Sequence, residues 1–521
     1  MGRLVRIAGS LAIVIAIAAP ASRAALRDRG GAASLCVGRQ PGCFGSIQAA
    51  VDAAPDGATI AVGPGTFAGG ITIAKSVTLR GAAAAATVIS GGGPVLTIGT
   101  AGALTEPTVS LSGVTVTDGL NTAPLALGGG VFVPASAFGL GATVTISDSV
   151  VSGNRAAPAS TVPGCPPFPF AGASGGGIDN FGTMTLERVL VSNNEAGSAV
   201  TSDANGGGIL NERGASLALR DVVVSGNTAD VVPPNGRFAA GGGIFTRRGS
   251  SMTINHSAVL RNTVHYRTSV PADDDCGGLG QGGGIKIGGD PSTDVTITDS
   301  LISQNSVRAT SSDGDLIAFG GGIEDDGTLT LTTSTIADNR LTGTGPAGVF
   351  LDSGGIEVFD PGVATISGAR ITGNTVAATA GGEALAQGGA MLAAGTQPIT
   401  IDDSVIVGNS ATSTSLSGTA EVEGAGLLNG GLLQLDRVQV SENTGTAGGG
   451  SGHAQGGGIW NGSLPDGFPV ELTARNVSIT RNALQASAGI PIRGGGLYTE
   501  LPAVLIESII TKNAPDNCFG C

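Results

Sequence analysis

The chain has 521 residues, of which 90 are glycine, 3% are aromatic and 13% are charged, and its formal net charge is −14 at pH 7. This charge excludes nucleic acid as a favoured partner, and it disfavours acidic polysaccharides unless a local basic patch or a bound calcium ion bridges the repulsion. Apolar residues make up 41% of the chain, so its composition lacks the apolar-poor signature of disorder.

Residues 1–24 have the pattern of a secretion signal peptide. Arg3 and Arg6 precede an apolar run, residues 7–19, and the small residues up to Ala24 suit signal peptidase. No later run of about eighteen apolar residues suggests a membrane helix. We therefore expect a secreted, extracellular protein, in solution or at the cell surface, with no transmembrane segment in the mature chain.

Residues 25–58 are predicted to form an N-terminal cap that contains a short amphipathic helix. Ser46 is a suitable N-cap residue for this helix, and Pro55 ends it. The apolar face of the helix consists of Ile47, Ala50, Val51 and Ala54. We expect this face to plug the open end of the fold that follows.

Residues 59–513 contain eleven copies of one repeat, each running from a glycine cluster to an asparagine. The clusters begin at Gly128, Gly175, Gly206, Gly241, Gly282, Gly320, Gly354, Gly388, Gly424, Gly456 and Gly494. The asparagines are Asn154, Asn194, Asn227, Asn262, Asn305, Asn339, Asn374, Asn409, Asn443, Asn482 and Asn513. Apolar and polar residues alternate within each copy, a period that predicts strands.

Each copy spans mostly 20 to 24 residues, enough for three short strands and their bends. Val or Ile stands three positions before every repeat asparagine, and a second apolar column lies eight positions before it. If one repeat forms one coil, stacked coils pair their strands in parallel about 4.8 Å apart and bury these columns. The glycines then permit tight bends, and the asparagines tolerate left-handed backbone and form a ladder of side-chain amides.

Variable segments of about 11 to 20 residues connect each asparagine to the next glycine cluster, and we expect them to be loops along one edge. Six cysteines in an exported chain indicate disulfides. They are Cys36 and Cys43 in the cap, Cys165 and Cys276 in the two longest loops, and Cys518 and Cys521 in a C-terminal tail, residues 514–521. The last two form a C-x-x-C pair, for which a redox or metal-binding role is the alternative.

Three stretches near the start, Ile47–Val51, Gly63–Phe67 and Val77–Gly81, resemble the right-handed parallel β-helix proteins of the pectin-lyase-like superfamily. The repeats themselves are similar to those of bacterial polymorphic outer-membrane proteins. The resemblance implies an all-β fold, a single right-handed parallel β-helix of about thirteen coils. It does not imply one activity, because the superfamily includes lyases, hydrolases, esterases, epimerases, adhesins and phage spikes.

The residue after the first apolar position of each glycine-led strand is expected to point outward, and this column supplies the candidate site. Its charged part, with neighbouring residues, gives five candidate catalytic residues: Lys286, Glu324, Glu357, Asp326 and Arg247. Carboxylates on adjacent coils would lie close to the spacing of a retaining glycosidase, and Lys286 or Arg247 would neutralise a uronate in a lyase. A solvated charged face is the competing interpretation.

Aromatic residues of the same column, Phe245, Trp460 and Tyr498, are candidates for stacking on sugar rings. Two aspartate-rich loops are candidates for calcium, through Asp273, Asp274, Asp275, Asp313 and Asp315. We expect a secreted bacterial β-helix that binds a polysaccharide, a surface glycan or another surface protein without turnover. The alternative is a polysaccharide lyase or glycoside hydrolase acting in a groove on the β-helix face.

Overall fold

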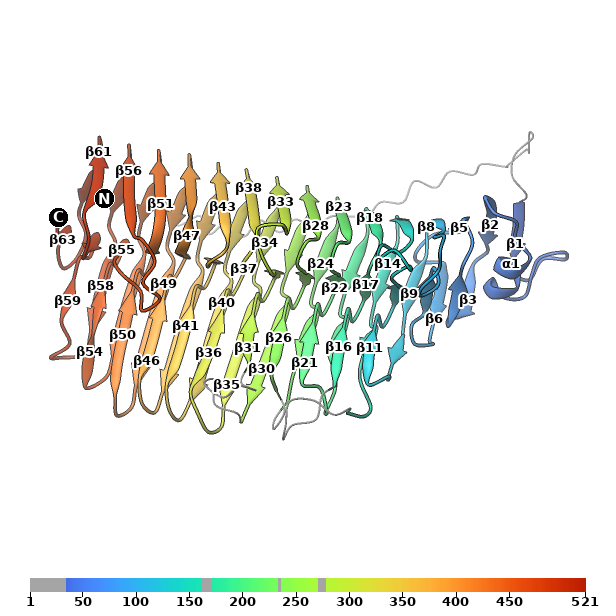
Figure 1. Ribbon diagram of the computed structural model, residues 1–521, viewed down its shortest axis with the longest axis horizontal. Coiled ribbons are helices and arrows are strands. Elements are labelled where there is room, and N and C mark those ends of the chain that lie inside the picture. Colours follow the sequence, from blue (N-terminus) through green and yellow to red (C-terminus); the bar gives the residue numbers. More distant parts are fainter. Residues whose placement is uncertain (1–33, 162–170, 233–235, 270–277) are drawn as a thin grey trace, which may run out of the picture. The chain divides into compact units, whose positions relative to one another are not determined.

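The computed structural model describes residues 34–161, 171–232, 236–269 and 278–521. The predicted signal peptide, residues 1–24, lies outside these ranges. From Ser34 onward the chain is wound into a parallel β-helix whose coils lie side by side in chain order (Figure 1). The predicted right-handed parallel β-helix is therefore confirmed.

A complete coil has five strands, which the coil around residue 300 illustrates. They are β31 (Leu279–Gln281), β32 (Ile285–Ile287), β33 (Asp294–Thr298), β34 (Leu301–Ser303) and β35 (Ser306–Ser311). Each pairs in parallel with the corresponding strand of the next coil, as β32 does with β37 (Ile323–Asp325) and β35 with β40 (Arg340–Gly345).

The described strands form four sheets, which we call A to D: sheet A has 27 strands, sheet B has 14, and sheets C and D have 11 each. In the coil above, β32 and β33 belong to sheet A, β34 to sheet B, β35 to sheet C and β31 to sheet D. Because each coil contributes one strand to sheet B, the 14 strands of this sheet mark fourteen described coils, close to the predicted number.

The main core lies between sheets A and B and consists of the predicted apolar columns. Ile297 and Ile302 are fully buried in the coil above, and Leu331 and Ile336 take the same places in the next coil. Continuous burial from coil to coil is what makes short strands of three to five residues stable.

The predicted asparagine ladder is confirmed. The Asn305 amide donates to the Val259 carbonyl at 2.9 Å and to Asn339 Oδ1 at 3.0 Å, and Asn339 Oδ1 also accepts the Asn305 backbone N–H at 3.0 Å. The same pattern repeats from Asn154 to Asn513.

The expectation that these asparagines take the left-handed backbone conformation is wrong. The left-handed residue is the one before the asparagine, for example Gln304 with φ 58° and Asp338 with φ 56°. The asparagine side chain must point inward to bond to two neighbouring coils, so the solvent-facing residue before it makes the bend.

The expectation that the variable segments are loops along one edge is also wrong for the described residues. After the asparagine the chain runs out through a strand of sheet C and returns through a strand of sheet D, and each of these sheets is continuous from coil to coil. The two sheets enclose a second core that includes Val264, Tyr266, Val307, Leu341 and Leu351. We call each such pair of strands an arm.

The first described elements cover the start of the stack. Helix α1 (Ile47–Ala53) has Ser46 as its N-cap, as predicted, and packs against β1 (Ser34–Val37), β2 (Ala58–Val62) and β4 (Ile71–Ile73). The Gln48 amide bonds to the backbone of Thr72 in β4 at 2.8 and 3.2 Å, which satisfies polar groups at the edge of a sheet.

Two predicted regions differ from their expected boundaries. β1, inside the predicted cap, pairs with β2 as a strand of sheet A, and β63 (Cys518–Phe519), inside the predicted tail, pairs with β60 (Leu497–Thr499). Both regions contain a disulfide, Cys36–Cys43 and Cys518–Cys521. Cys165 and Cys276 lie outside the described residues. Among the described helices, none has the length and apolar character needed to span a membrane.

Candidate functional site

The expectation that the column of candidate residues faces solvent is wrong. Its side chains point away from the main core, but they enter the corner between sheets A and D and are at most 7% exposed. The column consists of Asp179, Leu210, Phe245, Lys286, Glu324, Glu357, Leu392, Leu428, Trp460 and Tyr498. Met391 pairs with the inward-facing Ile356, so Leu392 and not Met391 belongs to this column.

Lys286, in the middle of the column, forms ion pairs with Glu324 and Asp326. Gln281, from sheet D, donates to Glu324 at 3.3 Å across the corner. Burial lowers the pKa of Lys286, but the charges of Glu324 and Asp326 outweigh it and hold the pKa above its ordinary value. Lys286 is therefore a cation at neutral pH and is poorly suited to abstract a proton.

Glu324 and Glu357 are strand partners on adjacent coils, as the spacing predicted. Burial raises the pKa of the Glu357 carboxyl well above its ordinary value, whereas Glu324 is held beside the Lys286 cation. Glu357 Oε2 is buried and makes no hydrogen bond within the described residues. Because both side chains are about 1% exposed, the predicted pair of glycosidase carboxylates has no open path to a substrate.

A pocket of about 500 Å³ opens beside this buried cluster. It is lined by Asp203, Asn205, Arg213, Phe238, Phe245, Arg247, Arg248, Gln281, Lys286, Gly288, Gly289 and Asp326. The floor comes from β27 (Ile244–Thr246) and β32, and one wall comes from β21 (Asp203–Asn205), β26 (Phe238–Ala240) and β31 of sheet D. This size is typical of sites for small ligands.

Arg247 is a cation at the pocket whose side chain is 37% exposed. Its guanidinium carbon lies 5.6 Å from the centre of the Phe245 ring, and its Nε lies 3.5 Å from Glu212 Oε2. The buried Nε makes no hydrogen bond within the described residues. The Nε atom faces the Glu212 carboxylate, and the planar guanidinium is held over an aromatic ring at the pocket, an arrangement that also suits a ligand carboxylate.

Burial raises the pKa values of one carboxyl group that lines the pocket and of two more that interact electrostatically with Arg247. The pKa of Asp203 is raised to about 6, mainly by burial and against the charges of Arg237 and Arg247. Burial also raises the pKa of Glu212, and it raises the pKa of Asp179 well above the ordinary value. Asp203 Oδ1 and Asn205 Oδ1 are buried without a hydrogen bond in the described part of the chain.

The structure therefore brings together Lys286, Asp326, Arg247 and Phe245 of the predicted site at one pocket. Sequence reasoning missed Asp203, Asn205 and Gln281, which enter from sheet D. Asn205 and Gln281 each stand directly before a glycine cluster, and this position is polar in most repeats. This polar position before the glycine clusters was the signal in the sequence that could have identified the sheet D side of the pocket.

Trp460 and Tyr498 are not at the pocket, and both are buried. Trp460 is 3% exposed and donates its Nε1–H to Gln455 at 3.1 Å. Residues 462–470, which we call the strap, connect β55 (Ile459–Asn461) to β56 (Glu471–Arg475), and Leu464 and Phe468 of the strap pack over the apolar end of the column. The expected role as exposed stacking platforms does not fit this burial.

The calcium candidates are not gathered into a site within the described residues. Asp315 Oδ1 accepts the backbone N–H of Gly348 at 2.6 Å, a bond between neighbouring arms, and Asp313 lies in the turn of its arm. Asp273, Asp274 and Asp275 lie outside the described residues. No group of three or more His, Cys, Asp or Glu side chains with metal-binding geometry occurs in the described ranges.

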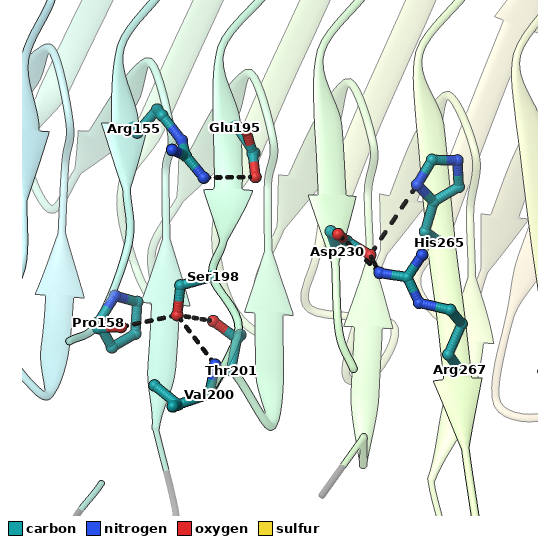
Figure 2. A network of polar contacts seen from close by, with 9 residues as sticks. All are labelled: Arg155, Pro158, Glu195, Ser198, Val200, Thr201, Asp230, His265 and Arg267. Atoms are coloured by element: carbon teal, nitrogen blue, oxygen red, sulfur yellow. Dashed lines mark hydrogen bonds and ion pairs between the residues drawn. The ribbon is translucent and has the colours of Figure 1, made fainter. Parts of the chain in front are cut away.

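A second set of polar side chains lies on the outer face of sheet C (Figure 2). Asp230 pairs with Arg267 at 2.6 Å and lies 3.9 Å from His265, and Ser198 bonds to Pro158 and Thr201 instead of to the histidine. These side chains are about one-fifth to two-fifths exposed, where ion pairs contribute little to stability. We therefore place the candidate site at the pocket.

No family model and no curated protein matches the sequence. Among solved structures, the chain is similar to the Azotobacter vinelandii mannuronan C-5 epimerase AlgE6 A-module, with 16% identity over 90% of this chain and 95% of that chain and a TM-score of 0.27. It is also similar to the Yersinia enterocolitica family 28 exopolygalacturonase, with 11% identity over 90% and 75% of the two chains and a TM-score of 0.29.

A third similar structure is a mannuronic acid specific polysaccharide family 6 lyase from human gut microbiota, with 9% identity over 83% of this chain and 82% of that chain and a TM-score of 0.24. At such identities and scores, no site residue is transferred from these proteins to this chain. Nothing in the comparisons supports the resemblance of the repeats to polymorphic outer-membrane proteins, which stays a prediction.

Proposed function

We propose that this protein is a secreted carbohydrate-binding β-helix whose pocket recognises a glycan that carries carboxylate groups, such as a uronate polymer. The observation that carries the proposal is Arg247, a pocket cation whose guanidinium carbon lies 5.6 Å from the centre of the Phe245 ring and whose side chain is 37% exposed. Secretion rests on the pattern of residues 1–24.

The charges around the pocket support an acidic ligand. Four of the chain's 26 basic residues line this one pocket, whereas only two carboxylates do. The whole chain disfavours a polyanion, and such a local basic patch is what would overcome the repulsion. Gln281 and Asn205 add amide groups of the kind that bond to sugar hydroxyls.

The test is titration calorimetry of the mature chain with oligogalacturonate, oligomannuronate and oligoguluronate. The same oligosaccharides with their carboxyl groups reduced to alcohols are the matched neutral ligands. We expect at least one oligouronate to bind and its reduced counterpart to bind much more weakly. Binding of none of the three series, or equal binding of the reduced forms, would refute the proposal.

Arg247→Gln should weaken that binding by about tenfold or more, because a hydrogen bond to a charged group contributes about 1.5–3 kcal/mol. Arg220→Gln is the matched control, since Arg220 is exposed at the end of β23 (Ser216–Arg220) and does not line the pocket. Equal affinity of both variants for the oligouronate would show that Arg247 does not contribute to binding.

Turnover of the bound glycan is the second candidate function, and Asp203 is the observation in its favour. A pocket carboxyl with its pKa raised to about 6 suits general acid or base chemistry near neutral pH. The wild-type chain would then release new reducing ends, unsaturated uronate or a changed uronate composition. Asp203→Asn would abolish the product but keep binding, and Asp294→Asn, on an exposed position of β33, would keep both.

A further inference from the structure

The corner between sheets A and D is filled on the C-terminal side of the pocket. Past Glu324 and Glu357 the column becomes apolar, and the strap lies over it. The Phe468 ring contacts the Phe359 ring edge to face, with centroids 5.6 Å apart. The strap therefore reaches back from β55 to the residue that follows β42 (Ile356–Val358).

Gly430 shows how closely the strap lies against sheet A. A Cβ atom at this position of β51 (Leu427–Asp436) would lie 2.5 Å from Leu464 Cδ1. Leu464 thus occupies the space that a side chain would take, and it covers Leu392 and Leu428, which are at most 1% exposed. No open channel continues along the corner in this direction.

The corner is also filled on the N-terminal side of the pocket. Leu210, on the first coil that lines the pocket, and Asp179, on the coil before it, are 0% exposed. The ring of Phe181, on the same coil as Asp179, meets the ring of Phe132, one coil earlier, edge to face, with centroids 6.2 Å apart. The hollow is therefore confined to the coils from β22 (Ile209–Asn211) to β37, four coils that span about 14 Å at the usual strand spacing.

We infer that the pocket accepts one end of a uronate chain and not its interior, and that the strap makes this selection. The inference rests on the proposed function. A chain interior lying along the solenoid axis would have to pass through the space of Leu464 and Phe468 on one side or of Phe132 and Phe181 on the other. A chain end enters the pocket from the surface and displaces neither pair.

The first test is the stoichiometry of binding as a function of ligand length, measured by calorimetry and by analytical ultracentrifugation. The ligands are short and long fractions of oligogalacturonate and oligomannuronate. End recognition predicts one protein molecule per glycan chain at every length, and an affinity per chain that does not rise with length. Binding along the interior predicts that the number of protein molecules per chain grows with length, which would overturn the inference.

This experiment distinguishes failure of the proposed function from failure of the inference that a chain end is selected. If oligouronates of no length bind, the proposed function fails and the inference fails with it. If they bind with several protein molecules per long chain, the proposed function stands and only the end selection is wrong. Reduction of the terminal aldehyde then tells which end is held, because loss of binding assigns the reducing end and unchanged binding assigns the other.

The second test opens the strap with the double substitution Leu464→Ala and Phe468→Ala. We expect long chains to bind more than one molecule of this variant, while short oligouronates bind with affinity unchanged within about twofold. Leu416→Ala is the control, because Leu416 is exposed in the turn of an arm and its loss leaves the strap in place. Near-ultraviolet circular dichroism and thermal unfolding confirm that the variants are folded.

One outcome would contradict the role of the strap in selecting the chain end. If the double variant is folded, its strap is open to limited proteolysis, and long chains still bind only one molecule, the strap does not select the chain end. A shorter glycine and serine connection in place of residues 462–470 provides a second opened form, in case the double variant keeps the strap docked.

Discussion

At the scale of single residues, each ladder asparagine connects three coils. Asn339 accepts the Asn305 backbone and side-chain N–H groups, and it donates to the Ile302 carbonyl at 3.0 Å and to Asn374 Oδ1 at 3.0 Å. All of these groups are buried, so each needs its partner.

Asn339→Ala should therefore destabilise the protein by about 3 kcal/mol or more, because it leaves several buried polar groups without partners at roughly 1–3 kcal/mol each. Asn255→Ala, at an outward and partly exposed position of β28 (Ser251–Asn255), should change stability by no more than about 0.5 kcal/mol. Urea unfolding of both variants measures the difference. Equal stabilities would mean that the ladder does not stabilise the stack.

Besides the asparagine ladder, another column of buried polar side chains runs through the main core, at the ends of the glycine-led strands of sheet A. Asn180, Asn211, Asn429 and Asn461 occupy this column, and Asn180 accepts the N–H two residues later. Asp325 takes the same place on β37, where its Oδ1 accepts the Gly327 N–H at 2.9 Å. Its Oδ2 is buried without a hydrogen bond in the described residues, and burial raises the pKa of Asp325 to about 8.

This shift makes stability fall as pH rises. The folded state keeps the Asp325 proton up to a pKa of about 8, whereas the unfolded chain releases it near its ordinary value of 3.8, so the stabilisation is fully present below about pH 4 and is lost by about pH 8. Asp325→Asn removes the titration and places an amide in a column that already holds amides.

Between pH 5 and pH 8 the wild type should therefore lose on the order of 4 kcal/mol more stability than Asp325→Asn. Chemical unfolding at the two pH values measures this difference, with Asp294→Asn as an exposed control on the adjacent coil. Parallel losses in wild type and Asp325→Asn would show that Asp325 does not hold its proton in the core.

At the scale of elements, the arms are structural parts of each coil. Leu341 of β40 is fully buried in the second core, and Thr344 of the same strand faces outward. Leu341→Ala should cost about 2–5 kcal/mol, whereas Thr344→Ala should change stability by no more than about 0.5 kcal/mol.

Hydrogen exchange provides an independent measurement on the same element. The backbone N–H groups of β40 should exchange as slowly as those of β39 (Thr335–Ala337) in sheet B, because both strands are paired on both sides. Fast exchange of β40, together with a small cost of Leu341→Ala, would contradict its place in a packed sheet.

The difference between the main core and the arms explains how much of the fold the sequence could predict. Val259, Ile302 and Ile336 are large, β-branched and repeated at a fixed distance from an asparagine, so their column is visible without a structure. In the arms, Val307 and Leu341 alternate with Arg308 and Thr342, but most other positions are Ala, Gly, Ser or Thr. Small residues suit two sheets that pack closely, and they give almost no hydropathic signal for strands.

The sequence indicated on which face of its strand Lys286 lies, but it did not indicate that this side chain is buried. The position of Lys286 on its strand follows from the period of two, whereas its burial depends on Gln281 and the rest of sheet D. Trp460 shows the same limitation, because its cover comes from Leu464 and Phe468 in a segment outside the repeat pattern. Periodicity indicates which face a side chain takes, but it does not indicate what packs against that face.

At the scale of the whole molecule, the chain is acidic, whereas four basic and two acidic residues line the pocket. The formal net charge is −14, and the pocket is lined by Arg213, Arg247, Arg248 and Lys286. A polyanion approaching from solution first meets the negative field and only at short range meets these cations. Added salt screens the long-range repulsion by the net charge more than the short-range attraction by the pocket cations. The reason is that the Debye length falls from about 30 Å at 0.01 M to about 8 Å at 0.15 M.

If the pocket binds uronate chains, their association rate should therefore rise with ionic strength over this range, since screening removes the long-range repulsion before it weakens contacts inside the pocket. Stopped-flow measurement with an oligouronate at several salt concentrations tests the sign. A basic surface that steers its ligand gives the opposite trend, a rate that falls steeply with salt. A falling rate here would mean that the ligand meets a positive surface outside the pocket, and that the net charge does not govern the encounter.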